Sequence, residues 1–258
     1  MRPIIAIFRK EFKGFLFNPN FLLVCALMAT LLSFLYPISL RSFQDQARNA
    51  MMFAHNSGGQ QLNIHYGVFL KHLSYLNLML ILVVPALTMR LFAEEKKMKT
   101  FDLLLTSPIT SAQIVIGKYL AALAAIFVIM LLAFLYPLST AYFAKINWGP
   151  LVVAFLGIFL VAAVYAAMSL FCSSLTESAI VAFAMAVLFN ISIWFVGVGV
   201  EVVDSSTARS VFEHISLNQH LTAMVEGTVR SSTLIFFGSA IFLFGFLSER
   251  VIESSRWR

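Results

Sequence analysis

The run Ser111–Leu135, SAQIVIGKYLAALAAIFVIMLLAFL, decides the fold class of this chain. As an α-helix rising ~1.5 Å per residue, it is long enough to cross a hydrocarbon core of ~30 Å. Runs of similar length and composition recur along the sequence at Phe21–Leu40, Val68–Met89, Pro150–Phe171, Ala179–Val200 and Ser232–Leu247. The sequence therefore predicts six transmembrane helices.

The composition of the whole chain agrees with a membrane protein. Of its 258 residues, 60% are hydrophobic and 12% charged, and the mean hydropathy is +0.88. Inside lipid every backbone N–H and C=O must be satisfied within the protein, which favours helices. We predict an all-α, polytopic fold that forms a single transmembrane domain over residues 1–258. Both cysteines, Cys25 and Cys172, fall in or at the end of apolar runs, so no disulfide framework is implied.

The distribution of basic residues predicts the orientation. The formal net charge of +6 would suggest nucleic acid in a soluble protein, but here the basic residues flank apolar spans and no nucleic-acid partner is implied. Twelve of the 18 lysines and arginines fall on one side: Arg2, Arg9, Lys10, Lys13, Arg90, Lys96, Lys97, Lys99, Lys118, Arg250, Arg256 and Arg258. The richer side is expected to be cytoplasmic, so six spans place both termini inside a bacterial inner membrane.

Two segments outside the spans have an amphipathic pattern. Residues 1–18 repeat apolar side chains at helical spacing, which predicts an interfacial helix that ends at Asn18-Pro19. On the outer side, residues 201–230 form the longest loop and carry enough apolar side chains for one or two amphipathic helices on or in the interface.

A few polar residues and prolines lie within the spans. We expect Asn77, Asn190 and Ser192 to make hydrogen bonds between helices, and Pro85 and Pro137 to kink two of them. The scarcity of charges deep within the spans argues against a proton-coupled carrier or ion channel.

The inner segment Met89–Thr110 reads MRLFAEEKKMKTFDLLLTSPIT. It predicts a short helix over Glu94–Leu105, with a Glu95–Lys99 ion pair. Met98, Phe101 and Leu105 would share one face of this helix, and Thr106-Ser107-Pro108 would end it. Thr110 and Gln113 would form a capping box for the next span. From the residues alone, the segment is either a plain interfacial connector or a docking element for a partner protein.

The second inner loop, residues 172–178, is shorter. Ser174 and Glu177 have the spacing of a capping box for the following span, and a cap is the reading that the residues favour.

Several kinds of active site are disfavoured. The sequence contains no G-x-x-x-x-G-K-[ST], so the chain has no motif of its own for cradling nucleotide phosphates. The five histidines do not form an H-E-x-x-H motif, and a metal site built from His55 and His65 is a weaker alternative to solvated histidines. No serine–histidine spacing suggests an intramembrane hydrolase. We therefore expect a non-catalytic chain without a bound metal or cofactor.

The stretch LFAEEKKMKTFDLLLTSPITSAQIVIGKYLAA resembles the inner loop of bacterial type-two ABC exporter permeases, most closely the gliding-motility and copper-processing subgroup. That subgroup has a charged E-E-[KR] segment, then E/D-L-L-L-T-x-P and G-K-[YF]. Two further patches are similar: KEFKGFLFNPNF resembles the family's interfacial helix, and Ser173–Thr176 resembles its S-x-x-T turn. Asp102 stands where glutamate is usual in the family.

The resemblance implies a permease subunit that exports a substrate, while a separate ABC ATP-binding subunit binds and hydrolyses ATP. It implies a second permease copy or a homologous chain as a further partner. In the family, the inner helix is the coupling element that contacts the ATPase. The residues assigned to that contact lie within the cytoplasmic coupling loop 90–110 and the second inner loop: Glu94, Glu95, Lys96, Lys97, Phe101, Asp102, Leu105, Thr176 and Glu177. The alternative function is an ATP-driven mechanical transmitter that acts on an outer-side partner protein without transport.

Overall fold

A computed structural model of the chain describes residues 2–53, 63–101, 109–202 and 206–255. In chain order its elements are α1 (Arg2–Leu16), α2 (Pro19–Phe53), the π-helical turn η1 (His65–Phe69), α3 (Leu70–Thr88), α4 (Arg90–Lys97), α6 (Ser111–Thr140), α7 (Trp148–Leu175), α8 (Ala179–Val202), α9 (Ser206–Ile215), α10 (Leu217–Val225) and α11 (Ser231–Ser255). Within the described residues, six helical segments are long and apolar enough to cross a membrane. The predicted all-α polytopic fold is confirmed.

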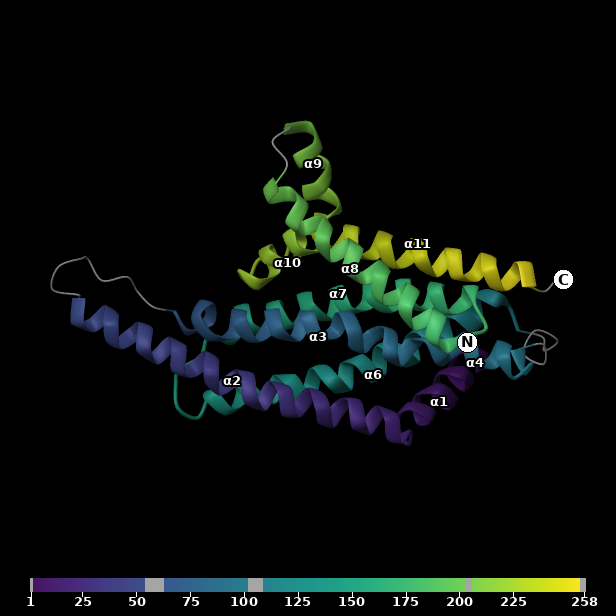
Figure 1. The fold of residues 1–258 in the computed structure, drawn as a ribbon, viewed down its shortest axis with the longest axis horizontal. Helices are drawn as coiled ribbons and strands as arrows, with labels where there is room; N and C mark the ends of the chain where they lie inside the picture. Colours follow the sequence, from purple (N-terminus) through teal and green to yellow (C-terminus); the bar gives the residue numbers. More distant parts are fainter. Residues whose placement is uncertain (1, 54–62, 102–108, 203–205, 256–258) are drawn as a thin grey trace.

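The chain begins and ends toward the same end of an elongated bundle (Figure 1). We call this the terminal end; it holds α1, α4, the last turn of α7 and the last turns of α11. We call the opposite end, which holds η1, the last turn of α6 and α10, the far end. An even number of spans places both termini on one side, as the sequence predicts.

Helix α2 is much longer than the span predicted from its sequence. The prediction stopped at Leu40, whereas the helix continues to Phe53 and has 35 residues, or about 52 Å at ~1.5 Å per residue. Polar residues after Leu40 end the apolar run without ending the helix, because glutamine, arginine and alanine are good helix formers. In Figure 1, α2 extends past its neighbours at the far end.

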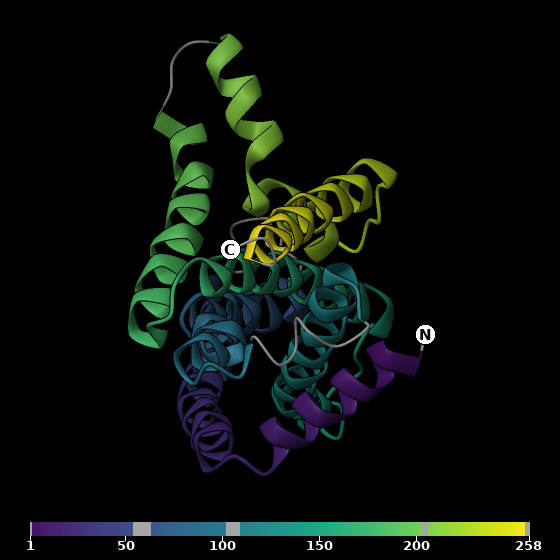
Figure 2. The same cartoon turned by 90° about the vertical axis from the view of Figure 1, so that its right-hand side faces the viewer.

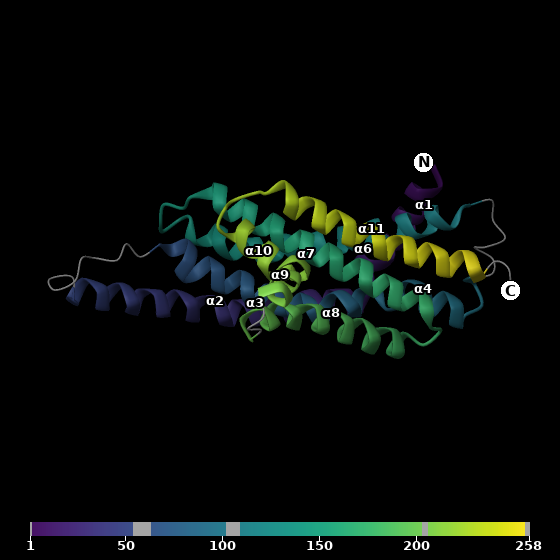
Figure 3. The same ribbon diagram turned by 90° about the horizontal axis from the view of Figure 1, so that it is seen from above.

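Helix α7 lies at the centre of the bundle and packs against α3, α6, α8, α10 and α11. Viewed from above, α11 runs along α7 (Figure 3). Small buried residues allow this close packing, among them Ala162, Ala163, Ala166 and Ala167. At Gly157 an added Cβ would lie 3.0 Å from Met224 Cβ, so the absence of a side chain admits α10.

Two carbonyls that prolines leave without a helical donor are each bound by a side chain of another helix. Pro137 has no N–H for the carbonyl of Ala133, and His72 Nε2 of α3 lies 3.0 Å from that oxygen. Pro85 likewise cannot bond Ile81, whose carbonyl accepts from Asn190 Nδ2 of α8 at 3.4 Å. The prediction of an interhelical bond is therefore confirmed for Asn190.

The same prediction is wrong for Ser192. Its hydroxyl donates to Leu188 O, one turn back in its own helix. For Asn77, which is buried, the side-chain oxygen has no hydrogen-bond partner among the described residues.

The outer loop forms two helices, as predicted. Helix α10 is anchored: Leu217, Leu221 and Met224 are buried, and His65 Nε2 lies 2.7 Å from Val225 O. Helix α9 and the adjoining part of α8 stand away from the bundle (Figures 1 and 2). The chain turns after α10 at Gly227, whose φ of 84° favours glycine.

Candidate functional site

The junction between α3 and α4 is held by one buried hydroxyl from α7. Ser173 Oγ donates to Met89 O at 2.8 Å and accepts from the backbone N–H groups of Phe92 and Ala93 at 3.2 and 3.3 Å. The first N–H groups of a helix have no partner within it, so this hydroxyl caps α4 from outside. The direction of α4 is therefore set by α7.

The end of α4 differs from the prediction. The helix begins at Arg90 and ends at Lys97, not at Leu105. Thr100 N bonds to Glu95 O at 3.1 Å, Lys99 N bonds to Lys96 O at 3.1 Å, and Lys99 has a φ of 56°. These are the bonds and the left-handed residue of a Schellman ending. Sequence reading missed it because glycine, the usual residue at that position, is absent.

The early ending separates residues that were predicted to share a face. Met98 is 72% exposed, whereas Phe101 is 4% exposed and its ring lies 6.3 Å from that of Phe92. Phe101 therefore packs inside the chain. Asp102 and Leu105 lie outside the described residues.

The charges of α4 divide into an outward and an inward set. Arg90 and Glu94 form an exposed i,i+4 ion pair at 3.2 Å, and Lys97 is exposed. Lys96 turns inward, donating to Ser174 O and lying 5.4 Å from the centre of the Phe101 ring. Glu95 also turns inward, so the predicted pairing with Lys99 is wrong.

Glu95 belongs to an ion cluster that joins three helices. Lys118 of α6 is 1% exposed, and its Nζ lies 2.9 Å from Glu95 Oε1 and 3.0 Å from Glu11 Oε1 of α1. The same ammonium donates to Leu91 O of α4 at 2.7 Å. Lys10 completes the cluster, 3.4 Å from Glu95 and 3.5 Å from Glu11. A buried ammonium needs such partners, since unpaired burial of a charge is costly.

Gly117 brings α1 close enough for the cluster to form. An added Cβ at this position would lie 2.9 Å from Ile7 Cβ and 3.3 Å from Ile4 O, so α1 crosses α6 where the side chain is missing. The glycine admits the helix, and Lys118, the next residue, binds its carboxylate. Three motif patches that are far apart in the sequence, Lys10-Glu11, Glu94-Glu95 and Gly117-Lys118, thus meet at one place.

The capping boxes have opposite outcomes. The box at Thr110 is confirmed, because its hydroxyl accepts from Gln113 N and Gln113 Oε1 accepts from Thr110 N. The box at Ser174 is wrong: Ser174 lies inside the last turn of α7 and donates to Phe171 O. Thr176 Oγ1 accepts from Ser178 N at 3.2 Å, and Glu177 is exposed.

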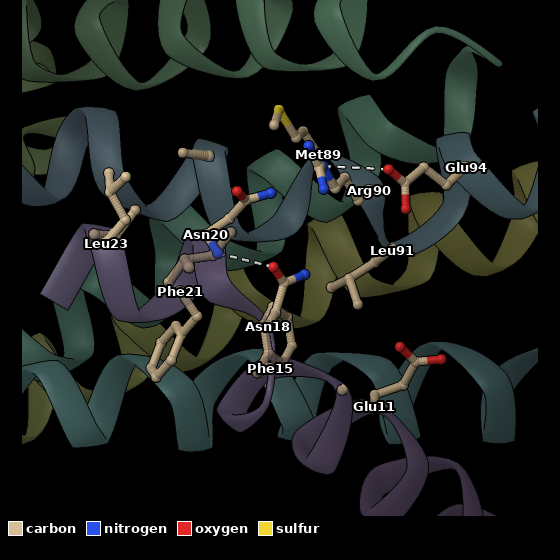
Figure 4. Close-up of a pocket in the computed structure, with 14 residues that line it drawn as sticks. Glu11, Phe15, Asn18, Asn20, Phe21, Leu23, Met89, Arg90, Leu91 and Glu94 are labelled. Carbon is tan, nitrogen blue, oxygen red and sulfur yellow. Dashed lines mark hydrogen bonds and ion pairs between the residues drawn. The ribbon is translucent and has the colours of Figure 1, made fainter.

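A cavity of about 440 Å³ opens beside the ion cluster, between the α1–α2 corner and the α3–α4 junction. Figure 4 shows Glu11, Phe15, Asn18, Asn20, Phe21 and Leu23 on one side of it, and Met89, Arg90, Leu91 and Glu94 on the other. The lining is amphipathic, with charged and amide groups next to apolar side chains.

The histidines do not gather into a metal site in the part of the chain that the structure describes. No group of three His, Cys, Asp or Glu is placed to hold an ion there. His65 and His72 are buried, and each forms a hydrogen bond with a backbone carbonyl; His55 lies outside the described residues.

Lys10, Glu11, Lys118 and Ser173 lie in the patches that the resemblance singled out, but sequence reasoning assigned them no role at this site. Lys118 carried a further signal, because a lysine within an otherwise apolar helix must find an anionic partner or reach water. The role of Ser173 depends on where α7 meets α4, which the sequence does not show.

Two comparisons with known proteins bear on identity. None of the curated proteins compared with the chain matches it. The family model described as "ABC-2 family transporter protein" matches residues 5–245, which is nearly the whole chain and includes α4, the ion cluster, five of the six candidate spans and part of the sixth. The chain therefore belongs to the ABC-2 family of transporter proteins, as a membrane-spanning component.

Proposed function

We propose that the chain is a permease subunit that exports its substrate and is driven by a separate ATP-hydrolysing subunit docked at the terminal end. Membership of the ABC-2 family supports a partner of this kind. The sequence has no phosphate-binding loop, so the partner would supply ATP hydrolysis. We also propose that the chain belongs to the gliding-motility and copper-processing subgroup, which its inner loop resembles.

The observation that carries the proposal is the set of contacts that hold α4 against the other helices. Its inner face is fixed to α7 by Ser173, and to α6 and α1 by Lys118, while Arg90, Glu94 and Lys97 face outward. A force on this outer face would reach three helices through buried contacts. We assign docking to Glu94, Lys97 and the neighbouring Glu177. Glu95, Lys96 and Phe101 position α4, and Asp102, Leu105 and Thr176 remain proposed contacts.

The proposal is tested by recovery of the ATPase. The tagged chain is expressed in its native host and purified in mild detergent, and co-purified ATP-binding subunits are quantified by mass spectrometry. Reversing both outer charges, Glu94→Lys with Lys97→Glu, should lower recovery, more at low salt than at high salt, because exposed pairs are screened. Lys145→Glu is the matched control, since Lys145 is an exposed lysine beyond α6 at the far end. Equal recovery for both variants would remove α4 as the docking element.

The cytoplasmic placement of the terminal end is tested separately. Single cysteines replace Lys97 and Arg209, both exposed, in a background lacking Cys25 and Cys172. An impermeant thiol reagent applied to intact cells should label position 209 and spare position 97. Labelling at 97 with silence at 209 would reverse the orientation.

Helix α9 supports a second candidate function, that of an ATP-driven mechanical transmitter. It stands off the bundle with Val211 54% and Ile215 43% exposed, and the helix that follows it is anchored by His65. A helix held in this position could contact an outer-side partner protein. Substrate accumulation in inverted vesicles holding the chain and its ATPase would favour export; hydrolysis without accumulation would favour transmission.

A further inference from the structure

The cavity between the α1–α2 corner and the α3–α4 junction lies where two candidate spans end. One wall is the beginning of α2, which starts at Pro19, and the other is the end of α3 at Thr88, followed by α4. Its volume of about 440 Å³ falls within the range of small-molecule sites. A ligand here would touch both the apolar part of the spans and the charged layer beside them.

The apolar wall continues into the spans. Leu23 of α2 and Ala86 of α3 line the cavity. One helical turn further along the same faces are Leu27, 52% exposed, and Leu82, 51% exposed. In a bilayer these exposed leucines face acyl chains, so a molecule seated in the cavity could continue directly into the lipid.

The polar part combines one guanidinium with two carboxylates and two amides. Arg90, Glu11, Glu94, Asn18 and Asn20 supply these groups. Arg90 pairs with Glu94 through its Nε, and the guanidinium has further N–H groups in a planar fork that suits phosphate oxygens. The carboxylates can accept from an ammonium group.

We propose that this cavity binds an aminophospholipid of the bilayer, of the phosphatidylethanolamine type. Arg90 binds the phosphate, and the acyl chains lie along Leu27 and Leu82. The primary ammonium donates to Glu94 and to Glu11, whose Oε1 also binds Lys118. An anionic headgroup without an amine, as in phosphatidylglycerol, would lie beside two carboxylates with no ammonium to donate to them. A choline headgroup has no N–H to donate. The site shares Glu94 with the proposed docking surface, but lipid binding needs only this chain and is measured without an ATPase.

The test uses the delipidated full chain in detergent. Native mass spectrometry measures retention of phosphatidylethanolamine, phosphatidylcholine and phosphatidylglycerol with matched acyl chains, and of soluble glycerophosphoethanolamine. We expect phosphatidylethanolamine to be retained about tenfold more strongly than the other two lipids, the effect of roughly one charge-assisted hydrogen bond. Equal retention of all three lipids would overturn the proposal. If soluble glycerophosphoethanolamine is retained as strongly as phosphatidylethanolamine, the cavity is assigned to a soluble phosphate amine instead.

Two variants locate the binding. Arg90→Ala removes the phosphate contact, which all three lipids share, and should lower the retention of all three; Arg250→Ala, which replaces an exposed arginine of α11 toward the same end, is its control. Ala86→Leu fills the cavity without changing charge, and Ala26→Leu, on an exposed position of α2 outside the lining, is its control. If Arg90→Ala does not fold, Ala86→Leu alone decides. Undiminished preference in Ala86→Leu would contradict binding in this cavity.

Glu94→Gln separates the amine from the phosphate. This variant should narrow the preference for phosphatidylethanolamine over phosphatidylcholine while leaving total lipid retention near that of the unmodified chain. An unchanged preference in Glu94→Gln, together with undiminished retention in Arg90→Ala, would show that these polar groups do not bind the headgroup, which contradicts the proposal.

Discussion

The two ends of the bundle join their helices with different chemistry. At the terminal end, a buried ammonium binds two carboxylates, and the cluster links α1, α4 and α6. At the far end and within the spans, side chains mostly bind backbone carbonyls: His65 binds Val225 O, His72 binds Ala133 O and Tyr136 binds Ala29 O. The ammonium of Lys71 there binds a hydroxyl, that of Ser42, at 3.2 Å.

The difference reflects the cost of charge in lipid. Neutral donors cost less to bury than ions, so they suit the hydrocarbon region. Charged groups cost less to bury where they keep contact with solvent. The side chains of Glu11 and Glu95 are 17% and 18% exposed, and that of Lys10 is 71% exposed. An ion cluster also depends strongly on each member, because removing one leaves another buried and unpaired. We therefore expect the terminal end to be more sensitive to single substitutions.

The largest effect is expected for Lys118→Met. Glu11 and Glu95 would then face each other without the ammonium, and breaking a buried ion pair on one side costs about 3–5 kcal/mol. The free energy of unfolding is measured by SDS titration in mixed micelles. Lys13→Met, an exposed lysine of α1, is the control and should change little.

Neutralising the carboxylates as well should recover most of this loss. In the triple variant Lys118→Met, Glu11→Gln, Glu95→Gln, no buried charge is left unpaired. If Lys118→Met is as stable as the unmodified chain, the terminal end is not held by charge and the contrast between the two ends disappears.

A smaller loss is expected for His72→Phe within the spans. The carbonyl of Ala133, which Pro137 cannot bond, would lose the imidazole donor, and an unsatisfied buried acceptor costs about 1–3 kcal/mol. Adding Pro137→Ala supplies a backbone N–H to that carbonyl. The double variant should therefore be more stable than His72→Phe alone in the same titration; no recovery would show that His72 acts by packing.

Gly117→Ala should have a net cost of about 1 kcal/mol. The added Cβ meets Ile7 at 2.9 Å, and overpacking costs about 1–3 kcal/mol, offset by about 1 kcal/mol of helix propensity. Gly14→Ala is the control, because nothing lies within 4 Å of its added Cβ. We expect the control to be at least as stable as the unmodified chain. A stabilising Gly117→Ala would mean that α1 can move away from α6 freely.

Lys10→Met should have the smallest effect, below about 1 kcal/mol, because exposed ion pairs contribute little. Burial lowers the pKa of Lys10, but Glu11 and Glu95 outweigh it and leave the pKa above its usual 10.5. A raised pKa means that the contribution is present below pH 10.5 and is lost only as pH rises through the raised value. The difference between Lys10→Met and the unmodified chain should thus stay constant from pH 7 to pH 9, measured by the same titration; a change across this range would contradict the assignment.

Sequence and structure agree on what depends on local pattern. The six long apolar helices, the amphipathic helix α1, the box at Thr110 and the helices α9 and α10 each follow from neighbouring residues. The reading failed at α4, where the Schellman ending at Lys99 uses a lysine in a glycine conformation, and at Ser174, where α7 simply continues. Both failures concern helix ends, where propensity and tertiary contacts compete.

The sequence by itself determined the fold class, because apolar runs of this length have one stable form in lipid. Its motif patches also determined which residues matter, without saying how. Only the tertiary structure decided that Lys10, Glu11, Glu95 and Lys118 form one cluster, that Phe101 faces inward, and that His72 and Asn190 bind the carbonyls that two prolines release. The physical reason is that partners for buried charges and free carbonyls come from other helices, and helix packing, not sequence proximity, brings them within reach.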